Sequence, residues 1–266
     1  MYSSKKKTGF SKFIASIPNW VWLIISLSVA ILLWVTISCT EKGGVIFANP
    51  IKVCEALMSK AADGTLWVHI GYSLLRVIVG FSLGFVASIP VAFLMGWYAP
   101  FRHVVEPWIQ FVRNIPPLAY IPLVIVGAGV GESSKIIVIF IACFLVLVVT
   151  IYQGVCNVAV TLIKAARILG ASDRDIFFRV IIPASTPFIL TGARLGLSAA
   201  LTTLVAAELT GASEGLGMMI QKASGYYDMG TVLMGIIVIG IIGISMEKLV
   251  RYLERRLTGW QETVQQ

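Results

Sequence analysis

Charged residues are scarce in this sequence. Asp, Glu, Lys and Arg make up 13% of the 266 residues, whereas hydrophobic residues make up 58% and the mean hydropathy is +0.89. In a soluble domain, about a quarter of the residues are charged. A chain with so little charge cannot hide its apolar surface in one core, so we expect lipid to be its solvent. The composition excludes a soluble domain and predicts an all-α membrane protein.

The residues that carry most enzyme chemistry are also sparse. The two histidines, His69 and His103, lie far apart, and the four cysteines have no metal-binding spacing. The sequence contains no G-x-x-x-x-G-K-[ST] phosphate loop, H-E-x-x-H or G-x-S-x-G motif. We therefore expect no metal site, no bound cofactor and no ATP hydrolysis in this chain. Cys39 and Cys54 could pair outside the cell or stay free thiols.

Six apolar stretches have the length of membrane spans. The first mimics a signal peptide, but its length and the absence of a cleavage site indicate a permanent helix. The second is too long for one upright span, so we expect it to begin along the membrane interface. Short helices are predicted at 50–61 and, on the surface, at 216–223, and a turn at 98–106. The predicted spans cover residues 20–38, 66–97, 107–129, 136–152, 188–208 and 232–248.

This pattern divides the chain into a tail at 1–19, a six-span domain at 20–250 with a polar loop at 157–186, and a second tail at 251–266. Two G-x-x-x-G pairs predict close contacts between helices: Gly80 with Gly84, and Gly192 with Gly196.

Charge placement predicts the orientation. The net charge is +8, and the sequence holds 21 Lys and Arg residues. With both termini in the cytoplasm, thirteen of them lie in inner segments and five in outer ones, while Arg76, Arg113 and Arg194 lie within spans. Positive residues favour the cytoplasmic side, so this orientation obeys the positive-inside rule and the reverse breaks it. The basic excess is thereby explained by the membrane, without nucleic acid.

The loop from 161 to 187 is the one long polar interruption in the second half of the chain. It predicts two short helices joined at Gly170, which can adopt a left-handed conformation, with Ser172 capping the second helix. Pro183 is expected to close the unit. The spacing also predicts an exposed apolar stripe made of Ile176, Phe177, Val180 and Ile181.

This loop resembles the Glu-Ala-Ala loop of ABC importer permeases, which docks as a coupling helix into a partner ATPase. An ordinary amphipathic loop between spans is the alternative. Lys164 stands where the family has its acidic residue, so that acid's contact is not implied here. The matching residues are Ala165, Ala166, Gly170, Ala171, Ser172, Phe178 and Pro183.

Other segments resemble permeases of the taurine, sulfonate and nitrate importer family, and the taurine-type permease above all. They are 113–123, 129–135, 203–208 and 215–217. The resemblance implies the type I ABC importer permease fold, a homodimer in the bacterial plasma membrane, two cytoplasmic ATPase subunits that bind ATP and Mg, and an extracytoplasmic binding protein. Transport would proceed by alternating access. Relatives of this architecture also serve bicarbonate, thiamin-precursor pyrimidines and riboflavin, so the substrate stays open.

Charged residues within spans are costly and indicate function by default. Arg113 precedes Pro116 and Pro117, which free the carbonyls of Val112 and Arg113 and predict a broken helix beside a path for an anion; packing alone is the alternative. Arg76 and Arg194 are further path candidates, although either could extend to the membrane surface. Glu208 is either a path residue or a structural hydrogen-bond partner.

Two other classes deserve comparison. A secondary transporter or channel would need no ATPase, but the sequence shows neither an internal repeat nor a mid-span acid placed for ion coupling. A membrane-embedded enzyme would need a nucleophile–base pair or a metal set within the spans, and none is evident.

Overall fold

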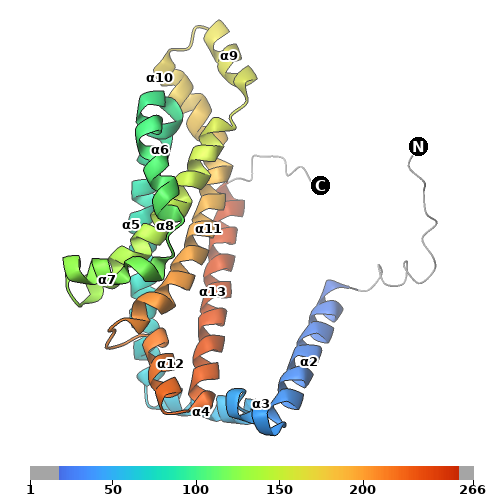
Figure 1. The fold of residues 1–266 in the computed structure, drawn as a ribbon. Helices are drawn as coiled ribbons and strands as arrows, with labels where there is room; N and C mark the ends of the chain where they lie inside the picture. The colour runs from blue at the N-terminus through green and yellow to red at the C-terminus, as the bar shows by residue number, and fades with distance from the viewer. Residues whose placement is uncertain (1–17, 258–266) are drawn as a thin grey trace.

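The structure, a computed structural model, describes residues 18–257, and every regular element in this range is a helix (Figure 1). The predicted all-α fold is confirmed. Residues 1–17, with Lys5, Lys6, Lys7 and Lys12, and residues 258–266 lie outside the described residues. In chain order the helices are α2 (Asn19–Ser38), α3 (Glu41–Ile46), α4 (Pro50–Ala62), α5 (Thr65–Trp97), α6 (Ala99–Arg113), α7 (Pro117–Ala128), α8 (Glu132–Cys156), α9 (Val160–Ile168), α10 (Asp173–Ile176), the π-helical turn η1 (Phe177–Ile181), α11 (Ile182–Leu209), α12 (Leu216–Gly225) and α13 (Met229–Leu257).

Three long helices form the centre of the fold. The most extensive contacts of α8 are with α5 and α11. Glycines bring these helices together: a Cβ atom added at Gly80 would lie 2.7 Å from Cγ2 of Ile139, and one added at Gly196 would lie 2.8 Å from Cγ of Leu147. Since both neighbours belong to α8, the predicted close contacts are confirmed.

The helices account for the predicted spans. Five are long and apolar enough to cross a membrane: α2, α5, α8, α13 and the continuous helix formed by α10, η1 and α11. Helices α6 and α7 pass the same test together, but they meet at 106° across the break at residues 114–116. Residues 18–257 therefore hold six candidate spans when this bent pair counts as one, and the predicted interruption of the third span is confirmed.

Several boundaries differ from the prediction. Helix α5 is one continuous helix of 33 residues, and only Tyr98 separates it from α6. The predicted turn at 98–106 is wrong because Pro100 stands in the first turn of α6, where a missing N–H costs nothing. Helix α13 continues to Leu257, beyond the predicted end at 248, and Arg251 pairs with Glu247 one turn earlier, at 2.6 Å.

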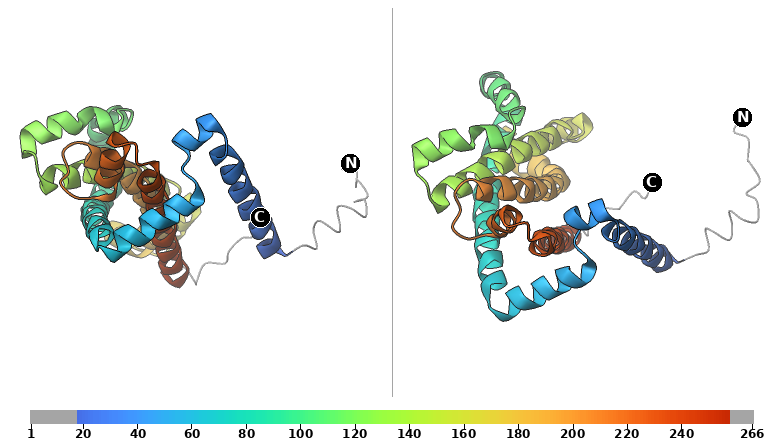
Figure 2. Two further views of the ribbon diagram at one scale, coloured as in Figure 1. Left: turned by 90° about the horizontal axis from the view of Figure 1, so that it is seen from below. Right: turned by 60° about the horizontal axis from the view of Figure 1, so that its bottom comes forward.

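The two ends of the central helices carry different elements (Figures 1 and 2). Helices α9 and α10 lie at one end, called the α9 end, and α4 and α12 lie at the other, called the α12 end. Helix α2 stands apart from the central helices in both figures. Its apolar side chains are exposed, and it is joined to the following segment by Nε1 of Trp34, which donates to the carbonyl of Ala48 at 3.0 Å.

Candidate functional site

Arg76 of α5 is a completely buried charge near the α12 end. Its Nε and Nη2 atoms donate to the two carboxylate oxygens of Glu132 at 2.6 and 2.7 Å. Its Nη1 atom donates to Oε1 of Glu208 and to the carbonyl of Glu214, both at 2.7 Å. The guanidinium thus joins α5 to α8, to α11 and to the segment before α12. The alternative that Arg76 extends to the membrane surface is wrong, because all three nitrogens find acceptors inside the protein.

Glu208 of α11 is the buried partner of this arginine. Its Oε1 atom also accepts from the hydroxyl of Ser73, and its Oε2 atom accepts from the amide of Gly217, both at 2.7 Å. A buried carboxylate is stable only when it is paired and hydrogen-bonded, and Glu208 meets both conditions. It is therefore a hydrogen-bond partner between helices. We call Ser73, Arg76, Glu132, Glu208 and the 214–217 backbone the Arg76 network.

Gly215 allows the backbone to approach these charges. Its φ is +134°, and an added Cβ atom would lie 2.5 Å from Oε1 of Glu208 and 2.6 Å from Nη1 of Arg76. Any side chain at this position would collide with the ion pair. The Leu216 amide, one residue further, donates to the Ser73 hydroxyl at 2.9 Å. The 215–217 segment is thus held against α5 by its own backbone.

His69 of α5 contacts the same segment through one atom. Its Nδ1 lies 2.9 Å from the amide of Gly215 and 3.0 Å from Oε2 of Glu214. A deprotonated Nδ1 accepts from the amide, whereas a protonated Nδ1 donates to the carboxylate, and the atom cannot do both at once. The protonation state of His69 therefore selects its partner before α12.

The loop at the α9 end has the predicted corner. Gly170 ends α9 with φ +79°, and an added Cβ atom there would meet no atom within 4 Å. The Ser172 hydroxyl accepts from the amide of Asp175 at 3.2 Å and donates to its carboxylate at 2.6 Å. These contacts confirm the glycine corner and the serine cap.

Two expectations about this loop are wrong. Pro183 does not close the unit, because α10 continues through the wide turn η1 into α11, with Pro183 in the first turn of that helix. A proline is tolerated in a first turn, and π-helical turns relax the spacing of hydrogen bonds. Nor is the predicted apolar stripe exposed: Ile176 and Ile181 are buried, and the ring of Phe177 packs edge-on against Phe93 and Trp97.

Other apolar residues of the loop are exposed instead. Ile168 and Leu169 are each 86% exposed, and Phe178 is 56% exposed. A hollow of about 430 Å³ lies beside Phe178, lined also by Trp97, Tyr98 and Arg174. Of the loop residues singled out in the sequence, Lys164, Ala165, Gly170, Ser172 and Phe178 are exposed, whereas Ala166, Ala171 and Pro183 are partly buried.

The bend between α6 and α7 places Arg113 on an exposed helix end. Arg113 is the last residue of α6, Pro116 precedes α7 and Pro117 is its first residue. The amide of Ile115 donates to the freed carbonyl of Val112 at 3.0 Å. The structure thus separates Arg113 from the Arg76 network and puts it at the bend.

Arg194 lies on a different face, between α11 and α13. Its Nη1 atom is 3.8 Å from Oε2 of Glu254, and its side chain is 36% exposed. It lines a hollow of about 430 Å³ that Glu247 also lines. The four path candidates Arg76, Arg113, Arg194 and Glu208 therefore do not form one site: only Arg76 and Glu208 meet.

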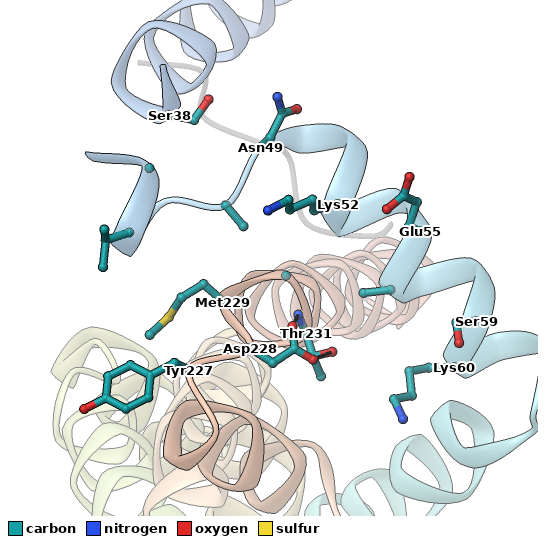
Figure 3. Close-up of a pocket in the computed structure, with 15 residues that line it drawn as sticks. Ser38, Asn49, Lys52, Glu55, Ser59, Lys60, Tyr227, Asp228, Met229 and Thr231 are labelled. Carbon is teal, nitrogen blue, oxygen red and sulfur yellow. Dashed lines mark hydrogen bonds between the residues drawn. The ribbon is translucent and has the colours of Figure 1, made fainter. Parts of the chain in front are cut away.

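A larger hollow, of about 910 Å³, lies at the α12 end (Figure 3). Helix α4 contributes Lys52, Glu55 and Lys60, and the segment that leads into α13 contributes Tyr227 and Asp228. Tyr227 is 81% exposed and has φ +58°, which is rare for a residue with a side chain. Charges of both signs thus face this hollow beside an exposed ring.

The short helix predicted at 216–223 is confirmed as α12 (Leu216–Gly225): Leu216, Gly217, Met219 and Ala223 are buried on one face, whereas Gln221, Lys222 and Ser224 are exposed. Within residues 18–257, no group of three or more His, Cys, Asp or Glu side chains could hold a metal ion. Cys39 and Cys54 are free thiols.

Three residues of this region were not predicted from the sequence. Ser73 and Glu132 belong to the Arg76 network, and His69 contacts it. A signal was nevertheless available. Under the predicted topology, the start of the second span, the start of the fourth and the end of the fifth lie at the same membrane face. Opposite charges at those three places predict an ion pair there.

Residues 80–259 match the family described as the binding-protein-dependent transport system inner membrane component. The chain therefore belongs to this family of ABC importer permeases, as its sequence motifs predict. It is a transport component of an inner membrane.

Individual relatives within this family are similar to the chain over most of its length. The chain is 51% identical over 239 residues to a Brucella abortus (strain 2308) protein named "Probable ABC transporter permease protein", covering 90% of this chain and 95% of that one. It is 39% identical over 246 residues to the taurine transport system permease protein of Escherichia coli (strain K12), covering 90% of each. Among solved structures, the inward-facing MetNI methionine ABC transporter matches with a TM-score of 0.65 at 19% identity, covering 73% of this chain and 96% of that one. That match supports the fold alone, and it agrees with the predicted type I importer fold.

Proposed function

We propose that this chain moves a small anionic solute of the sulfonate type across the plasma membrane by alternating access. The observation that carries the proposal is the 39% identity to a taurine permease across 90% of both chains. The loop at the α9 end supports it, because the loop exposes apolar residues that a soluble partner could bury.

We assign the α9 end to the cytoplasm and both termini with it. The loop there carries Lys164, Arg167, Arg174 and Arg179, and such a concentration of basic residues favours the cytoplasmic side. The α12 end then faces outward, where an extracytoplasmic binding protein would deliver the solute.

The energy would come from another chain. Two ATPase subunits, binding ATP and Mg, would dock on the loops of two copies of this chain, and closure of the ATPases would open the spans outward. The loop suits this task because α10, η1 and α11 form one continuous helix. A push on the loop would therefore travel directly into a membrane span.

Arg113 is our candidate for the first cation that the solute meets within the membrane. It is exposed beside the 106° bend, where Pro117 has no N–H to donate to the carbonyl of Arg113. A guanidinium binds the oxygens of a sulfonate through two donors, which a lysine ammonium reproduces poorly. Arg113→Ala should therefore reduce uptake severely and Arg113→Lys moderately, with unchanged thermal stability of the complex. Parallel loss of uptake and stability would instead make Arg113 an anchor of the bend.

The proposal is tested by reconstitution. The chain would be purified with its partner ATPase and binding protein and placed in vesicles, and uptake of labelled taurine would be measured. We expect uptake that requires ATP, the binding protein and an intact phosphate-loop lysine in the ATPase. Uptake that persists with that lysine replaced would favour a secondary transporter or channel. ATP-dependent uptake of bicarbonate, a pyrimidine or riboflavin, but not of a sulfonate, would support the importer function and contradict the proposed substrate class.

A further inference from the structure

The hollow that Arg194 and Glu247 line lies between α11 and α13. Helix α11 contributes Arg194, Leu195, Leu197, Ser198 and Leu201, and α13 contributes Gly240, Gly243, Ile244 and Glu247. All of these residues except Leu195 follow the i, i+3, i+4, i+7 spacing of one helix face, so one face of each helix lines the hollow. The α11 residues that line it lie about 10–21 Å along the helix from Glu208, and no lining residue belongs to the Arg76 network.

The size of this hollow suits a small solute. Its volume is about 430 Å³, within the range of roughly 300–1,000 Å³ that small-molecule sites occupy. Glycines widen it: a Cβ atom added at Gly240 would meet no atom within 4 Å, and one added at Gly243 would lie 3.5 Å from Leu201. Most of the other lining residues are aliphatic, so the few charged groups would decide which solute binds.

Those charged groups have opposite signs. Arg194 supplies a guanidinium whose contact with Glu254, at 3.8 Å, is longer than a hydrogen bond. Glu247 supplies a carboxylate whose Oε1 accepts from Arg251 at 2.6 Å. A carboxylate has two oxygens and room for about four hydrogen bonds, so Glu247 can bind a further donor. The hollow thus offers one cation and one anion to the same solute.

We infer that this hollow is a subsite on the transport path that takes a small zwitterion, with its sulfonate or carboxylate on Arg194 and its ammonium on Glu247. The inference rests on the proposed function and adds the second charge of the solute. A simple anion would bind Arg194 but be repelled by Glu247, whereas a zwitterion satisfies both groups at no change in net charge. Ser198 adds a hydroxyl that can donate to the solute's oxygens.

The test is equilibrium binding to the purified permease–ATPase complex without the binding protein, which would otherwise impose its own selectivity. The probes are labelled 2-aminoethanesulfonate and unlabelled ethanesulfonate, which differ by the ammonium group. We expect the wild-type complex to bind the zwitterion roughly tenfold or more tightly than the simple anion, because a hydrogen bond to a charged group contributes about that factor. Glu247→Gln should remove this preference by weakening the zwitterion alone.

Arg194→Lys should weaken both probes to a similar extent, because it keeps the charge and loses the two-donor geometry. The matched controls are Glu41→Gln and Arg255→Lys, which make the same chemical changes at exposed residues that do not line the hollow. Neither control should change binding, and all variants should keep their thermal stability. No binding of either probe, no preference in the wild type, or a preference that survives Glu247→Gln would overturn the inference. Failure of the proposed function is distinguishable, since it would abolish ATP-dependent uptake in vesicles and leave this binding assay unaffected.

Discussion

The two ends of the molecule differ in the burial of their ion pairs. At the α12 end, Arg76 and Glu208 are completely buried and every contact of their ion pair is made within the chain. At the α9 end, the ion pair between Arg179 and Asp175 is exposed and long, at 3.5 Å, and apolar side chains point outward. A charge buried within membrane spans must be satisfied internally, whereas an exposed apolar surface is stable only with a partner. The contrast indicates that the buried ion pair stabilises the packing of the helices at the α12 end, whereas the exposed side chains of the α9 loop are available to a partner.

The largest expected effect comes from breaking the closed end. Arg76→Met leaves Glu208 buried without its cation, and such a change costs about 3–5 kcal/mol of unfolding free energy. Arg179→Met, the matched change at the α9 end, removes a pair whose side chains are 82% and 42% exposed and should cost about 0–1 kcal/mol. Thermal unfolding of the purified chain in detergent compares the two.

A second variant distinguishes the effect of an unpaired buried charge from general misfolding. Arg76→Met combined with Glu208→Gln removes the orphaned charge and keeps one of the two acceptor oxygens that Ser73 and Gly217 contact, so stability should partly return. If Arg76→Met lowers the unfolding midpoint no more than Arg179→Met does, the buried network does not stabilise the α12 end.

The sequence predicted the loop at the α9 end better than the Arg76 network at the α12 end. The loop has local signals, since Gly170 and Ser172 act on their immediate neighbours, and both roles are confirmed. The partners of Arg76 lie 56 and 132 residues away, and only the stacking of three helices brings them together. Burial of the Ile176 stripe likewise depends on Phe93 and Trp97 of α5, which local spacing does not reveal. The positions of the spans were predictable because hydropathy is a local property, but the 106° angle between α6 and α7 was not.

The next prediction compares two left-handed glycines, one at each end. Gly64 at the α12 end and Gly170 at the α9 end have φ of +80° and +79°, and an added Cβ atom meets no atom within 4 Å at either. Valine should therefore impose the same strain of about 1–2 kcal/mol at both. Only Gly170→Val should abolish uptake and solute-stimulated ATP hydrolysis, since it misplaces α10 at the interface.

Membrane insertion of both glycine variants is checked first, by detergent-extractable yield and thermal unfolding. Equal transport by the two variants would show that the corner at Gly170 is not part of the coupling element.

Two helix caps offer a smaller comparison. Asp228 caps α13 by accepting from the Thr231 amide at 3.2 Å and from its hydroxyl at 2.6 Å, and Ser172 caps α10. Either change to Ala should cost about 1 kcal/mol. Asp228→Ala should lower stability with uptake retained, whereas Ser172→Ala should lower uptake in excess of its effect on stability. An equal loss of uptake in both variants would contradict the division between the two ends.

The Asp228 cap also predicts a pH dependence. The hydrogen bonds from Thr231 lower the pKa of the Asp228 carboxyl below its ordinary value. A depressed folded-state pKa gives stability that is full above the ordinary aspartate pKa and is lost as the pH falls through the lowered one. Wild type should lose this contribution in acid, and Asp228→Asn, which still caps, should not; identical acid profiles in thermal unfolding would argue against it.

The smallest effect is expected at Lys164, on the exposed surface of the loop. If the loop docks on an ATPase as proposed, Lys164 would present a cation to it. An exposed ion pair contributes about 0–1 kcal/mol, and Lys164→Ala should therefore be mild in both uptake and complex assembly. Lys164→Glu should weaken assembly further if an acidic residue of the ATPase faces it, because the attraction becomes a repulsion that salt screens.

The measurement is recovery of the ATPase with the tagged permease at low and high ionic strength. Greater loss at low salt supports an acidic partner, whereas equal recovery of wild type and Lys164→Glu at both salt concentrations means that no acid lies opposite this lysine.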